Sequence, residues 1–181
     1  NKRIEFPYLL LLISGGHTQF LEVKGVNNYK RLGTTIDDAL GEAFDKTAKL
    51  LGIEFPGGPK IEEWAKNGDG NYFKLPKPII KRGGCNLSFA GLKTAVLKVS
   101  KNIINEKEKF HLAASFQKTI NEILYEKTLV AMKDFLKNKK RKKNTFVIAG
   151  GVAANLKIRE NLTKLAKEKN FISVFPPVNL C

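Results

Sequence analysis

Cysteine and histidine are both scarce in this sequence, with two of each among 181 residues. The cysteines, Cys85 and Cys181, lie far apart and lack the C-x-x-C spacing of a zinc ribbon. Such a pair argues against a disulfide scaffold and favours a reducing compartment, so we expect a cytoplasmic protein. The only long apolar run, residues 9–13, is too short to cross a bilayer, and we expect no membrane partner.

The length is sufficient for one substantial domain or two small ones, and the hydrophobic content of 43% is sufficient for a core. The first residue is Asn1 rather than Met, directly before a strand-like stretch. The last is Cys181, directly after a proline-containing stretch with no closing element. We therefore expect a fragment of a longer protein.

The formal net charge is +15, which predicts a polyanionic partner, with nucleic acid as the first candidate. The densest basic block, residues 137–143, contains no aromatic side chain that would stack on a base. Such a block would hold phosphate rather than read bases. A second interpretation stays open, in which the lysines reflect A-rich codons and the block is a solvated helix end and loop.

The first quarter of the chain predicts strands followed by a helix. Residues 8–13 and 19–24 would form a hairpin around the turn Ser14–His17, and residues 29–35 a third strand. The apolar spacing over residues 39–51 predicts a helix that Gly52 ends. Asp37 or Asp38 is the expected cap.

The middle of the chain is predicted to be mainly helical. Pro56–Pro59 reads as a rigid loop before a short helix over residues 61–65. Short strands are expected over residues 73–90, then a helix from about Gly91. One long helix, or two abutting ones, would span residues 107–136, with its apolar face in the core.

The last part predicts a strand, a helix and a second strand. Residues 145–149 form a buried strand pattern, Gly150-Gly151 a tight turn, and a helix follows from Asn155. Residues 171–177 would be the next strand. This order implies a parallel strand pair joined by a crossover, and hence an α/β fold.

Two predicted strands end in Gly-Gly, at residues 15–16 and 150–151. Glycine lets backbone N–H groups approach an anion, and a following helix N-terminus adds positive potential. This arrangement suits a nucleotide, with phosphates on the hairpin turn and ribose or base near Asn155. The alternative, that each turn only needs a positive φ, stays open.

Four stretches in this order resemble the second half of the TsaD family of tRNA threonylcarbamoyladenosine transferases, once described as O-sialoglycoprotein endopeptidases. They are LLLLISGGHTQF, TIDDALGEAFDKTAKLLGIEFPGGPKIEEWA, NLSFAGLKTAV and VIAGGVAANLKIRENL. The resemblance covers nearly the whole chain. It implies transfer of a threonylcarbamoyl group from threonylcarbamoyl-AMP to N6 of the adenosine just 3′ of the anticodon.

The resemblance also implies the actin-like ATPase fold shared with sugar kinases and Hsp70, in which two lobes enclose the nucleotide. Residues 1–181 would then be a single partial domain, mainly the second lobe, with a mainly helical excursion at about residues 36–110. The first lobe and the C-terminal end would be absent. A fragment of this kind is expected to have little or no transferase activity by itself.

Carried over by position, the family's substrate site implies a role for nine residues here. Asp45 would lie on the ribose side, Gly58 would contact substrate and Glu62 would support it. His17 is the catalytic candidate, because it could donate to a phosphate or stabilise charge at the carbamoyl carbon. It could equally bind a backbone carbonyl of the hairpin. The implied substrate and nucleotide residues are Leu12, Ile13, Ser14, Gly15, Gly16, Asp45, Gly58, Glu62 and Asn155.

The resemblance further implies iron or zinc in the full-length protein, held by two histidines and an aspartate. The family's H-x-x-x-H motif precedes the point where this chain begins, and its aspartate follows the cysteine with which the chain ends. We therefore expect the metal ligands to lie outside this sequence. The implied partners are tRNA and TsaB-like and TsaE-like proteins.

Three other functions compete with this one. An actin-fold phosphotransferase would also use glycine turns, although the helix containing GEAFDKTAK argues against it. A metalloendopeptidase fits the older family description, but no H-E-x-x-H motif is present. The third is a non-catalytic basic scaffold that binds nucleotide or tRNA.

Overall fold

The computed structural model describes residues 4–137 and 144–177, in which a five-stranded sheet has the order β3-β2-β1-β4-β5. The antiparallel part comprises β1 (Tyr8–Ile13), β2 (Thr18–Gly25) and β3 (Asn28–Thr34). β4 (Asn144–Ala149) runs parallel to β1, and β5 (Phe171–Val174) runs parallel to β4. The predicted hairpin, the parallel crossover and the α/β class are confirmed.

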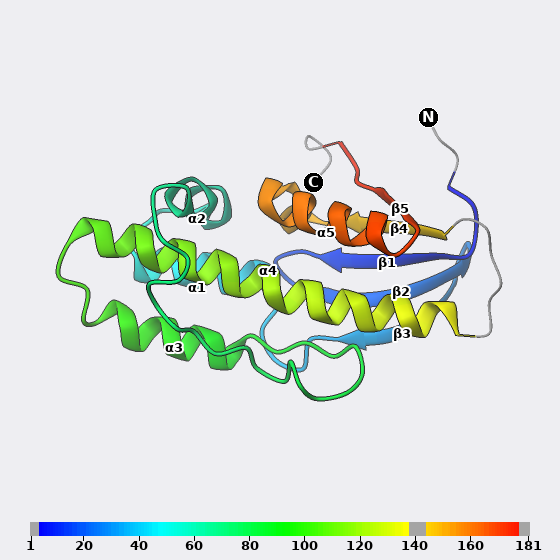
Figure 1. Cartoon of the computed structure of the whole chain (residues 1–181), viewed down its shortest axis with the longest axis horizontal. Helices are drawn as coiled ribbons and strands as arrows, with labels where there is room; N and C mark the ends of the chain where they lie inside the picture. Colours follow the sequence, from blue (N-terminus) through cyan, green and yellow to red (C-terminus); the bar gives the residue numbers. More distant parts are fainter. Residues whose placement is uncertain (1–3, 138–143, 178–181) are drawn as a thin grey trace.

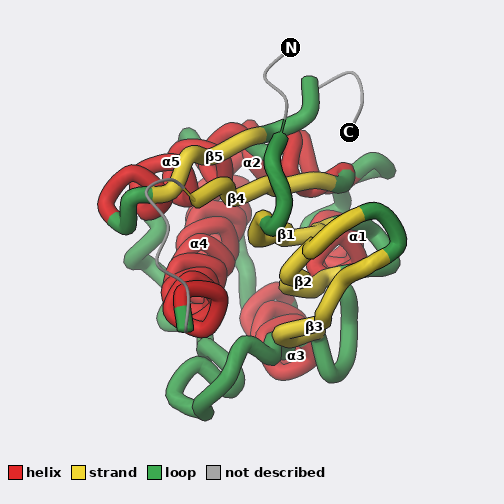
Figure 2. The backbone as a smooth tube through the Cα atoms, turned by 90° about the vertical axis from the view of Figure 1, so that its right-hand side faces the viewer, coloured by secondary structure: helices red, strands yellow, loops and turns green. Residues whose placement is uncertain are grey.

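Two helices cover one face of this sheet. α4 (Glu106–Leu136) and α5 (Leu156–Glu168) pack against each other there (Figures 1 and 2). Leu9, Leu11 and Ile13 of β1 are fully buried, whereas the residues between them are half-buried. This period of two directs one side of β1 into the core. Each fully buried leucine or isoleucine stabilises the fold by about 1.5–3 kcal/mol.

Three shorter helices lie beyond the carboxyl ends of β1 and β4 (Figure 1). They are α1 (Leu40–Leu50), α2 (Gly57–Ala65) and α3 (Ala90–Ser100), and α1 packs against both of the others. A short 3₁₀ turn, η1 (Gly151–Ala154), leads from β4 to α5. In open α/β sheets, ligands bind outside the carboxyl ends of the strands, and these helices surround that region.

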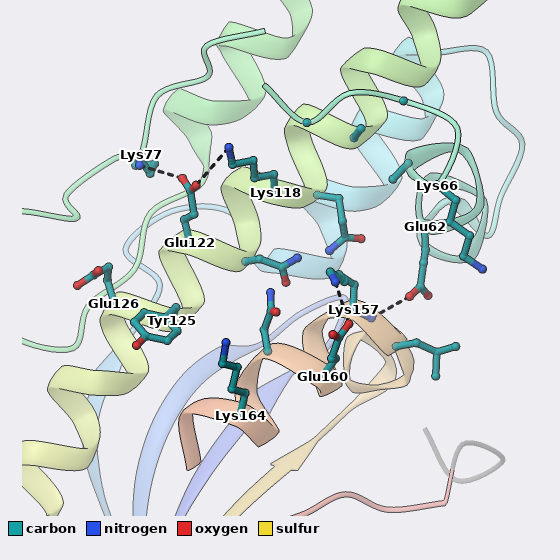
Figure 3. Close-up of a pocket in the computed structure, with 18 of the residues that line it drawn as sticks. Glu62, Lys66, Lys77, Lys118, Glu122, Tyr125, Glu126, Lys157, Glu160 and Lys164 are labelled. Carbon is teal, nitrogen blue, oxygen red and sulfur yellow. Dashed lines mark hydrogen bonds and ion pairs between the residues drawn. The ribbon is translucent and has the colours of Figure 1, made fainter. Parts of the chain in front are cut away.

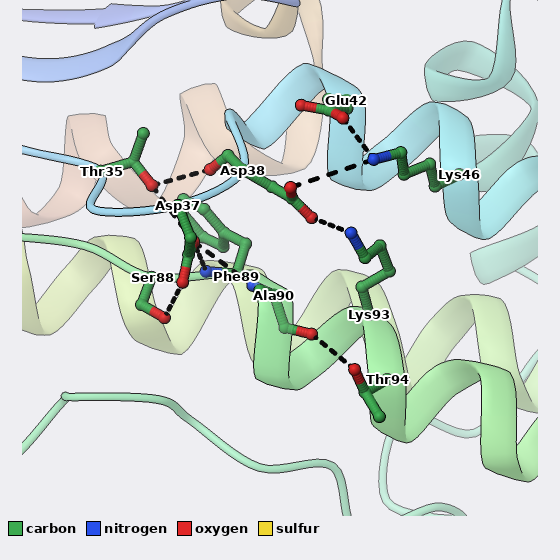
Figure 4. A network of polar contacts seen from close by, with 10 residues as sticks. All are labelled: Thr35, Asp37, Asp38, Glu42, Lys46, Ser88, Phe89, Ala90, Lys93 and Thr94. Atoms are coloured by element: carbon green, nitrogen blue, oxygen red, sulfur yellow. Dashed lines mark hydrogen bonds and ion pairs between the residues drawn. The ribbon is translucent and has the colours of Figure 1, made fainter.

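The predicted cap of α1 is wrong. Ala39 is the N-cap residue, and it makes no side-chain capping bond. The Asp37 carboxylate instead accepts hydrogen bonds from the backbone nitrogens of Phe89, at 2.7 Å, and Ala90, at 3.3 Å (Figure 4). Asp37 therefore caps α3, a helix more than fifty residues later in the chain. Asp38 forms ion pairs with the Nζ atoms of two lysines, Lys46 and Lys93.

Two further predictions in the middle of the chain are wrong. α2 begins at Gly57, with Pro56 as its N-cap residue, so most of the expected rigid loop is helical. A residue of α1 explains this early start. Asp45 Oδ1 accepts the Gly57 N–H at 3.1 Å, which satisfies one of the backbone amides that the first turn of a helix leaves without a partner. The short strands expected over residues 73–90 are absent from the described chain. That segment contributes only an isolated bridge between Thr35 and Leu87.

Residues 138–143 of the basic block, and Cys181, lie outside the described residues. Across the part of the chain that is described, no helix combines the length and apolarity needed to span a bilayer.

A buried polar contact fixes the segment that precedes α3. Lys127 of α4 is 1% exposed, and its Nζ donates to the carbonyl oxygens of Arg82, at 2.9 Å, and Gly84, at 3.2 Å. Cys85 beside them is 1% exposed. Burial, together with the Asp134 carboxylate, raises the pKa of the Cys85 thiol to about 12. The thiol is therefore neutral and unreactive at neutral pH.

We expect Cys85 in the folded protein to resist iodoacetamide at pH 8 and to react once urea unfolds the chain. Peptide mapping assigns the label to Cys85. Because its pKa is raised on folding, its contribution to stability is complete below pH 9 and is lost as the pH rises toward 12. Rapid labelling of Cys85 without urea would contradict this burial.

Candidate nucleotide-binding site

The turn between β1 and β2 presents two free backbone amides. Ser14 N donates to the His17 carbonyl at 2.8 Å, and His17 N donates to Ser14 Oγ at 3.0 Å. Gly15 and Gly16 are exposed, and within the described chain their N–H groups have no hydrogen-bond partner. A β-carbon at either position would have open space around it. Two adjacent free amides of this kind can bind an anion.

Neighbouring backbone holds this turn in place. Gly41 N, in the first turn of α1, donates to the Ser14 carbonyl at 3.1 Å. Gly150 follows β4 with a φ of +100°, and a β-carbon there would lie 2.4 Å from the Ile13 carbonyl oxygen. The glycine at 150 is thus required by backbone packing. No anion is needed to explain it.

A cavity of about 580 Å³ opens beside the turn. Asp45 lines it with one carboxylate oxygen bound to Gly57 N, and its Oδ2 has no hydrogen-bond partner in the described chain. A free carboxylate oxygen at this place can accept hydrogen bonds from ligand hydroxyls. The cavity is lined by Gly15, Glu42, Asp45, Lys46, Ala48, Lys49, Ile53, Glu54, Phe55 and Gly57.

A larger groove of about 1390 Å³ lies between α2, α4, α5 and the segment that follows α2 (Figure 3). Glu62 projects from α2 into it, and its Oε1 accepts the Lys157 N–H of α5 at 3.0 Å. Asn155 is 8% exposed, and its Oδ1 accepts the Ile158 N–H at 2.9 Å. Glu62 and Asn155 therefore both cap the N-terminus of α5.

Comparison with known protein families identifies the family of this chain. The profile of TsaD, described as tRNA N6-adenosine threonylcarbamoyltransferase, matches residues 1–181. The chain belongs to the TsaD family.

Curated TsaD relatives agree with this assignment. A protein named tRNA N6-adenosine threonylcarbamoyltransferase from Pelagibacter ubique is 70% identical over 181 residues, covering 100% of this chain and 51% of the relative. Proteins of the same name from Rickettsia massiliae and Rickettsia bellii are each 53% identical, covering 98% of this chain and 53% of the relative. The chain thus spans about half the length of the curated relatives that it matches.

Three of the residues implied by the TsaD resemblance line one of the two hollows. Gly15 and Asp45 line the cavity, whereas Glu62 lines the groove. Gly58 is half-buried in α2, on neither lining, with no atom within 4 Å of where its β-carbon would be.

Three further residues of the set have side chains that are buried, half-buried or already held by hydrogen bonds within the fold. Leu12 is half-buried at the end of β1, and Ile13 is fully buried in the core, so Ile13 can offer a ligand only its backbone. The Asn155 side chain is held by Ile158 and Gln117.

The histidines of the chain lie in different environments. His17 is exposed at the hairpin turn, and its catalytic role stays a prediction. His111 Nδ1 accepts the Asp69 N–H at 2.8 Å, and its ring stacks on Tyr72 with centroids 4.4 Å apart. His111 therefore has a structural role.

The described residues do not fit the metal that the TsaD resemblance implies. Within residues 4–137 and 144–177, no three His, Cys, Asp or Glu side chains come together to hold an ion. We therefore derive no step through a metal from this chain.

The sequence reasoning missed two residues of the groove. Gln117 and Asn121 of α4 are buried, line the groove, and each has a polar atom without a hydrogen-bond partner. The sequence contains a signal that could have identified them, because they are two amide side chains spaced i, i+4 within the otherwise apolar stripe of α4.

Replacing each of the two adjacent glycines of α2 with alanine should change the free energy of unfolding in opposite directions. A β-carbon at Gly57 would lie 2.3 Å from Ala48 Cβ, so Gly57→Ala should separate α1 from α2 and cost about 1–3 kcal/mol. Gly58→Ala meets open space inside a helix and should stabilise by up to about 1 kcal/mol. Urea denaturation of both variants measures this difference. Equal losses would mean that the α1–α2 packing is looser than described.

Proposed function

We propose that this chain forms the second-lobe half of an adenylate site in a tRNA threonylcarbamoyltransferase with the actin-like ATPase fold. The observation that carries the proposal is that Gly15, which has a free backbone amide, and Asp45, which has a free carboxylate oxygen, line the same cavity. The free amide of Gly16 follows directly in the turn. The strand order, with an antiparallel β1–β3 and a parallel β4 and β5, supports that fold. The helices inserted after β3 fit the expected excursion at about residues 36–110.

The proposed reaction is an acyl transfer. The N6 amine of the tRNA adenosine 3′ of the anticodon attacks the carbamoyl carbon of threonylcarbamoyl-AMP. A C–N bond forms, and the bond from that carbon to the phosphate oxygen breaks. AMP leaves with the bonding electron pair, and the amine proton passes to solvent or a base. The chain would hold the AMP leaving group.

The residues of the proposed site have distinct tasks. The Gly15 and Gly16 amides donate to the phosphate, whose negative charge increases as the bond breaks. His17, at the same turn, is placed to donate to the phosphate or to the developing charge at the carbamoyl group. Asp45 Oδ2 accepts hydrogen bonds from the ribose hydroxyls, and Gly58 leaves room for the ligand beside α2.

Asp45→Ala should weaken AMP binding by roughly 1–3 kcal/mol, because ribose hydrogen bonds are lost. Calorimetric titration of AMP into the protein measures the change. Asp45→Asn is the matched variant, since its amide oxygen still accepts the Gly57 N–H and preserves the start of α2. Unchanged AMP affinity in Asp45→Ala would remove Asp45 from the site.

The remaining parts of the proposal concern the longer protein. tRNA is the substrate, TsaB-like and TsaE-like proteins are its partners, iron or zinc is its metal, and the cytoplasm is its location. The net charge of +15 supports a polyanionic substrate.

Binding of tRNA should weaken steeply with salt if the basic block contacts phosphates. Replacing the five basic residues at 139–143 with serine should reduce the slope of log K against log salt by about 0.7–0.9 per lost contact. The double variant Lys98→Ser, Lys101→Ser on and after α3 is the control for general charge loss. An equal reduction per charge in both variants would show that the block has no special role.

A further inference from the structure

Positive charge gathers at the end of the molecule that lies opposite the cavity. The C-terminal end of α4 and the turn between β2 and β3 lie at this end, on the right in Figure 1 and facing the viewer in Figure 2. Three segments form it, residues 22–31, 81–85 and 126–137. Together they contain eight lysines and arginines but only three carboxylates, whereas the whole chain has 32 against 17.

Asp134 of α4 is the point at which these segments meet. Lys137 Nζ lies 2.7 Å from one oxygen of the Asp134 carboxylate, and Cys85 Sγ donates to the other oxygen at 3.5 Å. The hydrogen bond from Lys137 lowers the pKa of the Asp134 carboxyl, and the charge of Lys30 on β3 lowers it further. One carboxylate thus has cations from α4 and from β3 beside it.

The buried Lys127 holds a further cation at this end. Its Nζ donates to the Arg82 carbonyl oxygen at 2.9 Å, which fixes the backbone of a residue whose side chain is exposed. Burial lowers the pKa of Lys127, and the charge of the nearby Arg82 lowers it further. Arg82 is therefore held beside α4 although its segment has no regular secondary structure.

Most of these cations are exposed and uncompensated. Six of them have no ion-pair partner within residues 4–137 and 144–177, and they are Lys24, Lys30, Arg31, Lys81, Arg82 and Lys133. With Lys137 they form what we call the basic end surface.

The charge at the cavity is of the opposite sign. Its lining contains the carboxylates of Glu42, Asp45 and Glu54 but only two lysines, Lys46 and Lys49. Lys46 is also paired there, with Glu42 and with Asp38. A-rich codons raise the number of lysines, but they do not by themselves separate charge between two ends of a molecule.

We propose that the basic end surface binds the phosphates of the RNA stem that carries the reactive adenosine. β2 connects the hairpin turn at the cavity to this surface, and its eight residues span about 24 Å. An RNA that places one base at the cavity can therefore lay its backbone across the far end. Phosphate contacts of this kind orient an RNA without reading its sequence. This inference rests on the proposed function and adds a second contact surface to it.

The shape of the surface favours RNA over an anionic bilayer, the other polyanion of sufficient size. Peripheral membrane binding of this kind needs a broad apolar face beside the cations. Among the large apolar side chains of the three segments, only Val26 and Tyr29 are exposed. Tyr29 is 65% exposed, and a single aromatic ring among cations can stack on an unpaired base.

Titration of tRNA at a series of salt concentrations, followed by fluorescence anisotropy, tests the surface. The double variant Lys30→Ser, Arg82→Ser removes one exposed cation from each of two segments. We expect the slope of log K against log salt to become less steep by about 1.4–1.8, since each lost phosphate contact contributes about 0.7–0.9. The matched control is Lys98→Ser, Lys101→Ser, on and after α3 at the other end of the molecule, and it should leave the slope unchanged.

Equal changes of slope in the two double variants would overturn the proposal. It would also be overturned if Lys30→Ser, Arg82→Ser lost binding to phosphatidylserine vesicles while its tRNA binding stayed the same, because the partner would then be a membrane. If that variant does not fold, Arg31→Ser decides alone. It should reduce the slope by about 0.7–0.9, and an unchanged slope would contradict the surface.

Calorimetric titration with AMP keeps this proposal apart from the adenylate site. Both double variants should bind AMP as the unaltered protein does, because none of the four residues lines the cavity. If the unaltered protein binds AMP but no tRNA, the basic end surface is overturned and the adenylate site stands. If it binds tRNA with the expected dependence on Lys30 and Arg82 but binds no AMP, the adenylate site is overturned and the surface stands.

Discussion

Close approach of backbone segments around the hairpin turn is the constraint on which the rest of the structure depends. A β-carbon at position 150 would lie 2.4 Å from the Ile13 carbonyl oxygen, and one at position 41 would lie 2.8 Å from Gly15 Cα. Side chains essentially never tolerate such distances, so glycine at both positions lets β4 and α1 reach the turn. The same kind of contact at Gly57 brings α2 onto α1. The approaches at Gly41 and Gly57 bring the hairpin turn, α1 and the start of α2 together around the cavity.

Capping between distant elements links these parts. Asp37 caps α3, Asp45 caps α2, and Glu62 caps α5 together with Asn155. Three of these four residues belong to the set that the family resemblance assigns to the nucleotide. Their polar atoms are partly engaged within the fold, which pre-positions the side chains before any ligand arrives.

Local patterns were sufficient to predict much of the fold. The alternation in β1 and the apolar stripe of α4 are periodic patterns, and the Gly-Gly turn is a pair of adjacent residues. All three are local signals, and all three match the structure. The cap on α3 could not be predicted, because Asp37 and Phe89 are far apart in sequence. The early start of α2 depends in the same way on Asp45.

The site was predictable only in part for the same reason. Family motifs point to Asp45 and Asn155, but no local pattern indicates that Gln117, thirty-eight residues earlier in the chain, contacts Asn155. The burial of Lys127 could not be predicted either, because its two carbonyl partners come from a segment without regular secondary structure.

The bond between Glu62 and Lys157 N has a consequence for the shape of the groove. It joins α2 directly to the first turn of α5, so two walls of the groove are held together by a side chain as well as by packing. Only Oε1 of the carboxylate takes part in this bond, and a carboxylate has a second oxygen with its own lone pairs. A hydroxyl group in the groove can therefore bind Oε2 while α2 and α5 stay joined, so filling the groove does not require its walls to separate.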